Sequence, residues 1–259
     1  SYFQTTRFEI RPSSTLQVLD VRNIHNDYPE DISLSEMKAI RMLSEKWFMS
    51  LFSSMFPHAY DLQPTLYICL ARKKDGSWDA YCDDQSRELG LCSSNPIIAW
   101  SKQLKQATQD LGSVFKGACL IPIHLNIEWW EHDELRGNHA NTLLFHPKTK
   151  TIWVFDPKGE LHFGKFIFLR LLRTLSNRIG CQFKGYLTPK CDFQIDNEEL
   201  CFVWTTWVEC LARWNPWLTP IQLAKYLKIR FRKFYRNYNT RQTAIQFCHF
   251  LKDLSQHHT

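Results

Sequence analysis

The stretch HANTLLFHPKTKTIWVFD, residues 139–156, decides the fold of this chain. An apolar run follows His139, the turn residues Pro-Lys-Thr-Lys close it, and a second run, TIWVF, ends directly before Asp156. Two apolar runs joined by a short polar turn are typical of adjacent antiparallel strands. Because side chains of such a pair lie close together, we expect the imidazole of His139 and the carboxyl of Asp156 to meet at one sheet edge.

A second segment carries a cysteine at the expected start of a helix. The acidic sequence DNEE, residues 196–199, precedes Cys201 and an apolar segment with helical spacing that stops at Asn215. These are typical start and stop signals of a helix. A thiolate at a helix N-terminus is stabilised by backbone N–H groups and the helix dipole, so we predict a nucleophile at Cys201. Cys210 lies more than two turns further on, and we expect it in the core.

Together these residues supply the parts of a thiol-dependent active site. A thiol becomes a nucleophile when an imidazole takes its proton, and the imidazole works best when a third group orients it. His139, Asp156 and Cys201 match these three roles. Asn141, two residues after His139 on the same strand face, is an alternative orienting group.

The segment before Cys201 holds candidates for binding an oxyanion. Gln194, seven residues earlier, can offer a side-chain N–H to a tetrahedral intermediate. Two neighbours, Asp196 and Asn197, are alternatives for this position.

In order and spacing, these segments resemble the ubiquitin-like-protein proteases and the adenain-type proteases of clan CE. The resemblance covers about residues 118–215 and includes LIPIHLN (120–126), TIWVFDPKG (151–159) and the cysteine that heads a helix. It implies an α+β fold with a papain-like-superfamily core, in which a central mixed or antiparallel sheet packs against the helix of the nucleophile, with helical elaborations. By the same resemblance, the base, its partner, the nucleophile and the oxyanion donor are His139, Asp156, Cys201 and Gln194.

Two positions depart from the family pattern. The family usually has Trp directly after the catalytic His, where Ala140 stands, and Gly after the nucleophile, where Phe202 stands. The sequence CFVWTTW, residues 201–207, looks closer to divergent members in large DNA viruses and intracellular bacteria. We expect the substrate channel to be lined by Trp129, Trp130, Ala140 and Asn141.

The composition fits one large domain. The 259 residues are 44% hydrophobic and 14% aromatic, enough for a substantial core. We expect a single catalytic domain, with an N-terminal elaboration and substrate-selecting surface in 1–117, the catalytic core in 118–215 and basic C-terminal helices in 216–259.

Other sequence features bear on cofactors and location. There is no HEXXH motif or phosphate-binding Gly-rich loop, so we expect no metal and no cofactor. The nine cysteines form no C-x-x-C pair, and we expect reduced thiols in the cytosol or nucleus. No apolar run is long enough for a membrane span and no leader opens the chain. A viral protein or secreted bacterial effector acting inside a host cell fits these expectations.

The sequence therefore predicts a protease that cleaves after the C-terminus of ubiquitin or a ubiquitin-like modifier and acts on modified proteins. A viral polyprotein protease and a protein acetyltransferase with the same triad are alternatives. A different class, a non-catalytic or nucleic-acid-binding module, is suggested by the net charge of +6 and by KYLKIRFRKFYRNYNTRQ, residues 225–242. Basic and aromatic residues can bind phosphates and bases, although a solvated helix face or a site for an acidic protein has the same composition.

Overall fold

The computed structural model describes residues 65–81, most of 98–109, 120–160, 165–193, 200–215 and 218–237. Within these residues, six strands form one mixed sheet in the order β2-β1-β3-β4-β5-β6. Two pairs are parallel, β1 with β3 and β5 with β6, and the other three are antiparallel. In chain order the strands are β1 (Thr65–Arg72), β2 (Trp78–Tyr81), β3 (Ile121–Glu131), β4 (Glu134–His146), β5 (Thr151–Phe155) and β6 (Gln182–Tyr186).

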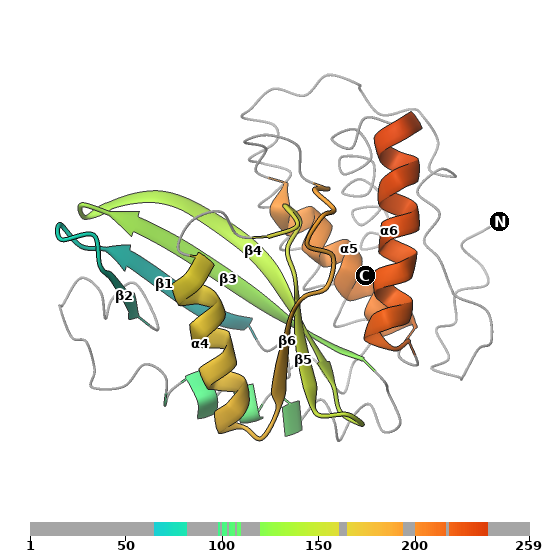
Figure 1. Cartoon of the computed structure of the whole chain (residues 1–259), viewed down its shortest axis with the longest axis horizontal. Helices are drawn as coiled ribbons and strands as arrows, with labels where there is room; N and C mark the ends of the chain where they lie inside the picture. Colours follow the sequence, from blue (N-terminus) through green and yellow to red (C-terminus); the bar gives the residue numbers. More distant parts are fainter. Residues whose placement is uncertain are drawn as a thin grey trace, which may run out of the picture.

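Helices cover both faces of this sheet. Figure 1 shows α4 (Lys165–Arg178) on one side of the sheet and α5 (Cys201–Trp214) and α6 (Pro220–Asn237) on the other. Successive strand residues face opposite sides, so Leu143 packs into the cluster with α4 while Leu144 packs into the cluster with α5 and α6. Because both faces are covered there, the stretches LLF of β4 and IWVF of β5 are continuously apolar rather than alternating. The expected α+β class is thus confirmed.

The hairpin between β3 and β4 is longer than the sequence suggested. Its two turn residues, His132 and Asp133, have φ angles of 53° and 61°, as a tight type I′ connection requires. β4 begins at Glu134, so His139 lies within the strand and the expectation that it opens the strand is wrong. The first residues of β4 are exposed and polar, and the apolar run that marked the strand begins only at Ala140.

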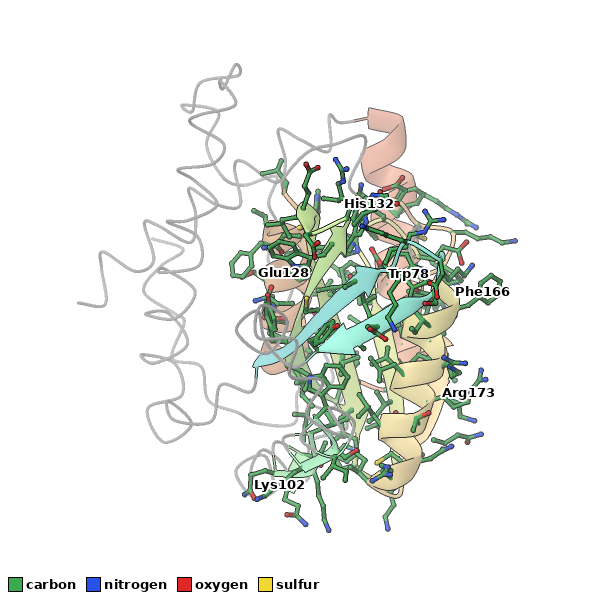
Figure 2. The ribbon with its side chains drawn as sticks, turned by 90° about the vertical axis from the view of Figure 1, so that its left-hand side faces the viewer. Trp78, Lys102, Glu128, His132, Phe166 and Arg173 are labelled. Carbon is green, nitrogen blue, oxygen red and sulfur yellow. The ribbon has the colours of Figure 1, made fainter. Side chains whose placement is uncertain are left out.

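Most other described elements match the expected ones. The sequence of residues 64–82, with the turn KKDG between two apolar runs, predicts a hairpin, which is β1 with β2, and TIWVF is β5. Residues 97–112 have helical spacing, and the described residues of 98–109 are helical. The helix after Asp156 is α4, whose outer face carries Phe166 and Arg173, pointing away from the sheet in Figure 2; Phe166 is 89% exposed. The helix expected at residues 33–56 lies outside the described residues.

The strands β1 and β2 precede the predicted catalytic core, residues 118–215, but belong to the same sheet as its strands. β1 pairs in parallel with β3 along its whole length, from Thr65 opposite His124 to Arg72 opposite Glu131. The strands β1 and β2 therefore extend the sheet that carries His139. Among the described helices, none has the length and apolar content needed to cross a membrane.

Candidate active site

His139 and Asp156 are joined by a short hydrogen bond. Nε2 of His139 lies 2.7 Å from Oδ1 of Asp156, and both side chains are buried, 5% and 1% exposed. β5 pairs with β4 only from Thr142 to His146. His139 therefore lies on the part of β4 that β5 leaves uncovered, and Asp156 follows the end of β5. The structure thus brings the two predicted side chains together at a sheet edge.

A tight turn fixes the carboxylate of Asp156. The backbone N–H of Lys158 donates to Oδ1 at 2.8 Å, and the N–H of Gly159 donates to the Asp156 carbonyl at 2.9 Å. Such a turn, in which an aspartate accepts from its own backbone two residues on, is a common use of this residue type. Gly159 has a φ of 81°, and a Cβ there would lie 2.8 Å from the carbonyl oxygen of Pro189. The turn thus requires glycine at this position.

The pair keeps the imidazole of His139 charged. Burial lowers the pKa of His139, but the charge of Asp156, its hydrogen bond and the interactions with Cys201 outweigh burial and raise the pKa to about 10. The contribution of Cys201 to this pKa places the thiol within interaction range of the His139 ring. Since Asp156 occupies Nε2, Nδ1 is the nitrogen left for the thiol. A protonated ring beside a thiol is the arrangement that favours a thiolate–imidazolium pair.

Cys201 is the first residue of α5, as the sequence predicted. The preceding residue, Leu200, provides no side-chain cap. The thiol is buried, 6% exposed, and packs with Ala140 and Phe202. Ala140 thus lies against the first turn of α5.

Two other described cysteines have a different environment. Burial raises the pKa of the Cys181 and Cys191 thiols and outweighs the basic residues near them. A thiol whose pKa is raised is a poorer nucleophile at neutral pH. Cys210 lies within α5, but its side chain is outside the described residues.

Asn141 does not hold the imidazole. Its side chain is fully buried, and its amide atoms make no hydrogen bond within the described part of the chain. Of the two candidates, Asp156 is the one that contacts the His139 ring.

The predicted channel tryptophans lie near the end of the β3–β4 hairpin. Trp129 and Trp130 are half-buried, and the strand register shifts between them. Trp129 lies over Gly137, where an added Cβ would be 2.8 Å from the indole ring. Trp130 donates through Nε1 to Glu128. Ala140 and Asn141, the other predicted substrate contacts, are 2% and 0% exposed.

The three candidates for oxyanion binding, Gln194, Asp196 and Asn197, lie outside the described residues. The residue just before them, Phe193, lies in the core. Phe193 is fully buried, with ring contacts to Phe155, Trp204, Trp207 and Phe231. The tryptophans of α5 thus pack the helix that bears Cys201, as the sequence suggested.

A second histidine–carboxylate pair was missed by the sequence reasoning. Nδ1 of His124, on β3, lies 2.8 Å from Oε1 of Glu209, on α5, and Oγ1 of Thr142 donates to the same oxygen at 2.9 Å. Glu209 is fully buried. The available signal was that Glu209 is the one acidic residue in CFVWTTWVECLARW.

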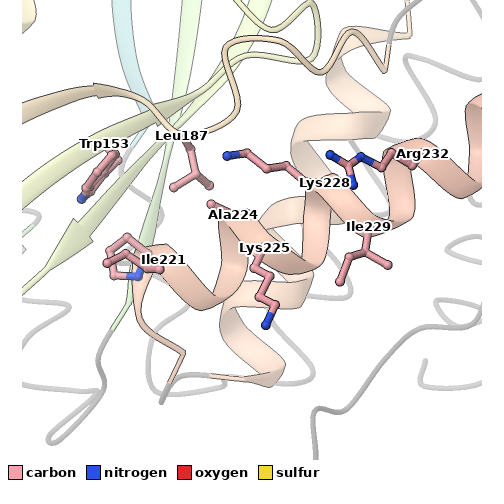
Figure 3. Close-up of a pocket in the computed structure, with 9 residues that line it drawn as sticks. Trp153, Leu187, Ile221, Ala224, Lys225, Lys228, Ile229 and Arg232 are labelled. Carbon is pink, nitrogen blue, oxygen red and sulfur yellow. The ribbon is translucent and has the colours of Figure 1, made fainter.

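A separate groove runs along α6, and Figure 3 shows its lining. It has a volume of about 470 Å³ and is lined by both apolar side chains, including Trp153 and Ile221, and three cations, Lys225, Lys228 and Arg232. No acidic residue lines it among the described residues. Three of the basic residues in the segment 225–242, which suggested a phosphate or an acidic partner, thus lie along one groove. No cluster of three or more metal-binding side chains occurs in the described ranges.

Compared with protein-family models and with curated proteins, the chain matches none.

Proposed function

We propose that this protein is a cysteine protease of the papain-like superfamily that cleaves after the C-terminus of ubiquitin or a ubiquitin-like modifier. One observation carries the proposal: the buried His139 is bound to Asp156 at 2.7 Å, and Cys201, at the start of α5, is close enough to contribute to its raised pKa. A nucleophile, a base and a carboxylate that orients the base are the minimum set for acyl transfer through a thioester.

The first half of the reaction forms the thioester. The Cys201 thiolate attacks the carbonyl carbon of the scissile bond, and the negative charge moves to the carbonyl oxygen. The backbone N–H of Cys201 and the side chain of Gln194 bind this oxyanion. The tetrahedral intermediate then collapses, the C–N bond breaks, and the His139 imidazolium gives its proton to the leaving amine.

The second half releases the product. Neutral His139 takes a proton from water, the water oxygen attacks the thioester carbon, and the thiolate leaves as the imidazolium is restored. Asp156 holds Nε2 of His139 in place throughout. Its fixed position in the turn of Lys158 and Gly159 avoids reorganisation during the two proton transfers.

The arrangement of sheet and helix supports the papain-like core. Helix α5 begins at the nucleophile and packs against β3 and β4, the strand of the base. The tryptophans of β3 remain the proposed lining of the substrate channel, together with Ala140 and Asn141. In this proposal Ala140 forms the base of the channel, since its own side chain is buried against Cys201 and Phe202.

The choice of modifier is assigned to the surface formed by residues 1–117. A truncation at residue 117 would remove β1 and β2 from the sheet. A test of selectivity must therefore keep residues 65–81 and remove only what precedes them. Unchanged selectivity after such a truncation would contradict this assignment.

The test of the function is a panel of ubiquitin and ubiquitin-like probes, SUMO included, each with a C-terminal electrophile. The wild type should form a covalent adduct with at least one probe, and Cys201→Ala should form none. Cys191→Ala is the matched control, because this thiol is also buried, and it should react like the wild type. An adduct that persists in Cys201→Ala would exclude this nucleophile. Absence of any adduct would favour a polyprotein protease, an acetyltransferase or a non-catalytic module.

A further inference from the structure

The triad leaves unused the buried ionisable pair of His124 and Glu209. His124 and Thr142 are directly opposite each other in the β3–β4 register, so their side chains share one face of the sheet. Both bind the same carboxylate oxygen of Glu209, at 2.8 and 2.9 Å. His124 is 8% exposed and Glu209 is fully buried. A charged pair in this position is costly to bury without such partners.

This pair lies beneath the helix of the nucleophile. Phe202 and Glu209 are seven residues apart on α5, which places them on one helix face. The ring of His124 contacts both: it binds Glu209 and meets Phe202 edge-on, with ring centroids 5.2 Å apart. Phe202 is the residue next to Cys201. His124 therefore lies along the helix between Glu209 and the turn of the nucleophile.

We propose that His124, held by Glu209, is a positioning residue that stabilises the thiolate of Cys201 as a second positive charge beside His139. The inference deepens the proposed function, since it rests on Cys201 being the nucleophile. In this arrangement Glu209 does for His124 what Asp156 does for His139: it accepts a ring N–H and favours the imidazolium. Cys201 then interacts with two histidines, each paired with a buried carboxylate.

The charges around His124 support this role. Burial lowers the pKa of His124, but the charge and hydrogen bond of Glu209, the side chain of Asn126 and the charge of Cys201 outweigh it and raise the pKa. Interaction between two titrating groups is reciprocal. If the Cys201 thiolate favours the protonated form of His124, then protonated His124 favours the thiolate to the same extent.

A purely structural role is the competing explanation. The hydrogen bonds of Glu209 link α5 to β3 and β4 and would hold the helix in place even with a neutral Cys201. That role predicts lower stability on substitution but no change in the ionisation of the thiol. The two roles are therefore separated by measuring thiolate formation directly.

The experiment measures alkylation of Cys201 by iodoacetamide as a function of pH, read by mass spectrometry on the peptide that contains Cys201. Compared with the wild type, His124→Gln should slow the reaction at neutral pH by about tenfold, the low end of the effect of an opposite charge on a titrating neighbour. The rate should recover at higher pH. Thr142→Val is the matched control, since it removes one hydrogen bond to Glu209 and keeps the charge of His124. An unchanged pH dependence in a folded His124→Gln would overturn the proposal.

The reciprocal measurement does not depend on the folding of that variant. In wild type and Cys201→Ala, the ring of His124 is titrated by nuclear magnetic resonance. Loss of the thiolate should lower the pH at which His124 titrates, and an identical titration would overturn the proposal. Neither readout needs a substrate. A missing probe adduct together with a shifted titration would reject the proposed function and leave this inference standing.

Discussion

The backbone N–H of Phe193 donates a hydrogen bond of 2.7 Å to the carbonyl oxygen of Pro157. Pro157 follows Asp156, and Phe193 precedes Gln194 and the segment that leads to Cys201. This bond therefore joins the turn of Asp156 to Phe193, whose ring packs against α5, the helix that begins at Cys201. The ring of Phe193 strengthens the connection through its contacts with α5 and α6.

Replacing the ring of Phe193 should weaken both stability and activity. Phe193→Ala removes a fully buried ring from an aromatic cluster, and such truncations cost about 3–5 kcal/mol. Urea denaturation measures the loss, and kcat/KM should fall with it. Phe166→Ala is the control: this ring is 89% exposed, and its loss should change stability by less than about 0.5 kcal/mol. Equal effects of the two substitutions would contradict the role of the cluster.

Adding a methyl group at Gly159 should disturb the site more than the same change elsewhere. Gly159 and Gly76 have φ angles of 81° and 83°, so alanine is strained at both. The two positions differ in what an added Cβ would contact. At Gly159 it would lie 2.8 Å from the backbone oxygen of Pro189, and at Gly76 no atom lies within 4 Å. Gly159→Ala should therefore lower both the midpoint of thermal unfolding and the rate of probe labelling. Gly76→Ala should lower the midpoint only slightly and leave the labelling rate unchanged. If the two variants labelled equally fast, the Asp156 turn would not be needed for activity.

The charge of Asp156 should set the alkaline limit of activity. With a pKa of about 10, His139 remains an imidazolium acid across the neutral range. Asp156→Asn removes the charge and weakens the hydrogen bond that raise this pKa. The alkaline limb of the kcat/KM profile should then move to lower pH, and kcat/KM at neutral pH should fall on the order of a hundredfold. An alkaline limb at the same pH in both proteins would mean that another group controls it.

The same ion pair should make stability depend on pH in a defined direction. The folded pKa of His139, about 10, lies above its ordinary value of 6.5. The unfolded chain then loses this proton first as pH rises. The stabilisation by protonated His139 is fully present below about 6.5 and is lost as pH rises toward and through 10. The difference in unfolding free energy between wild type and His139→Gln should shrink over this window. A constant difference would contradict the assigned pKa.

Local signals were sufficient for much of the fold and the site. The bounds of β5 follow from an apolar run between a turn and Asp156, and α5 begins at Cys201 after an acidic stretch. The contact of His139 with Asp156 follows from the hairpin that joins their strands. Each of these inferences uses residues close together in the chain, where turns and periodicity determine geometry.

Long-range pairing could not be predicted in the same way. His124 and Glu209 are 85 residues apart, and neither carries a local sign of the other. The place of β1 between β2 and β3 depends on a parallel pairing across a long connection. The first half of β4 could not be recognised as a strand from its sequence, because its residues are polar and exposed. It is a strand because it pairs with β3, not because it is buried.

The most direct test of the central claim is a competition among the nine cysteines for a limiting amount of iodoacetamide at neutral pH. Peptide mass spectrometry identifies which thiol reacts first, in wild type and in His139→Ala. We expect Cys201 to react ahead of the other cysteines in the wild type and to lose this lead in His139→Ala. If Cys201 reacted no faster than Cys181 or Cys191, or kept its lead without His139, it would not be a nucleophile activated by this histidine.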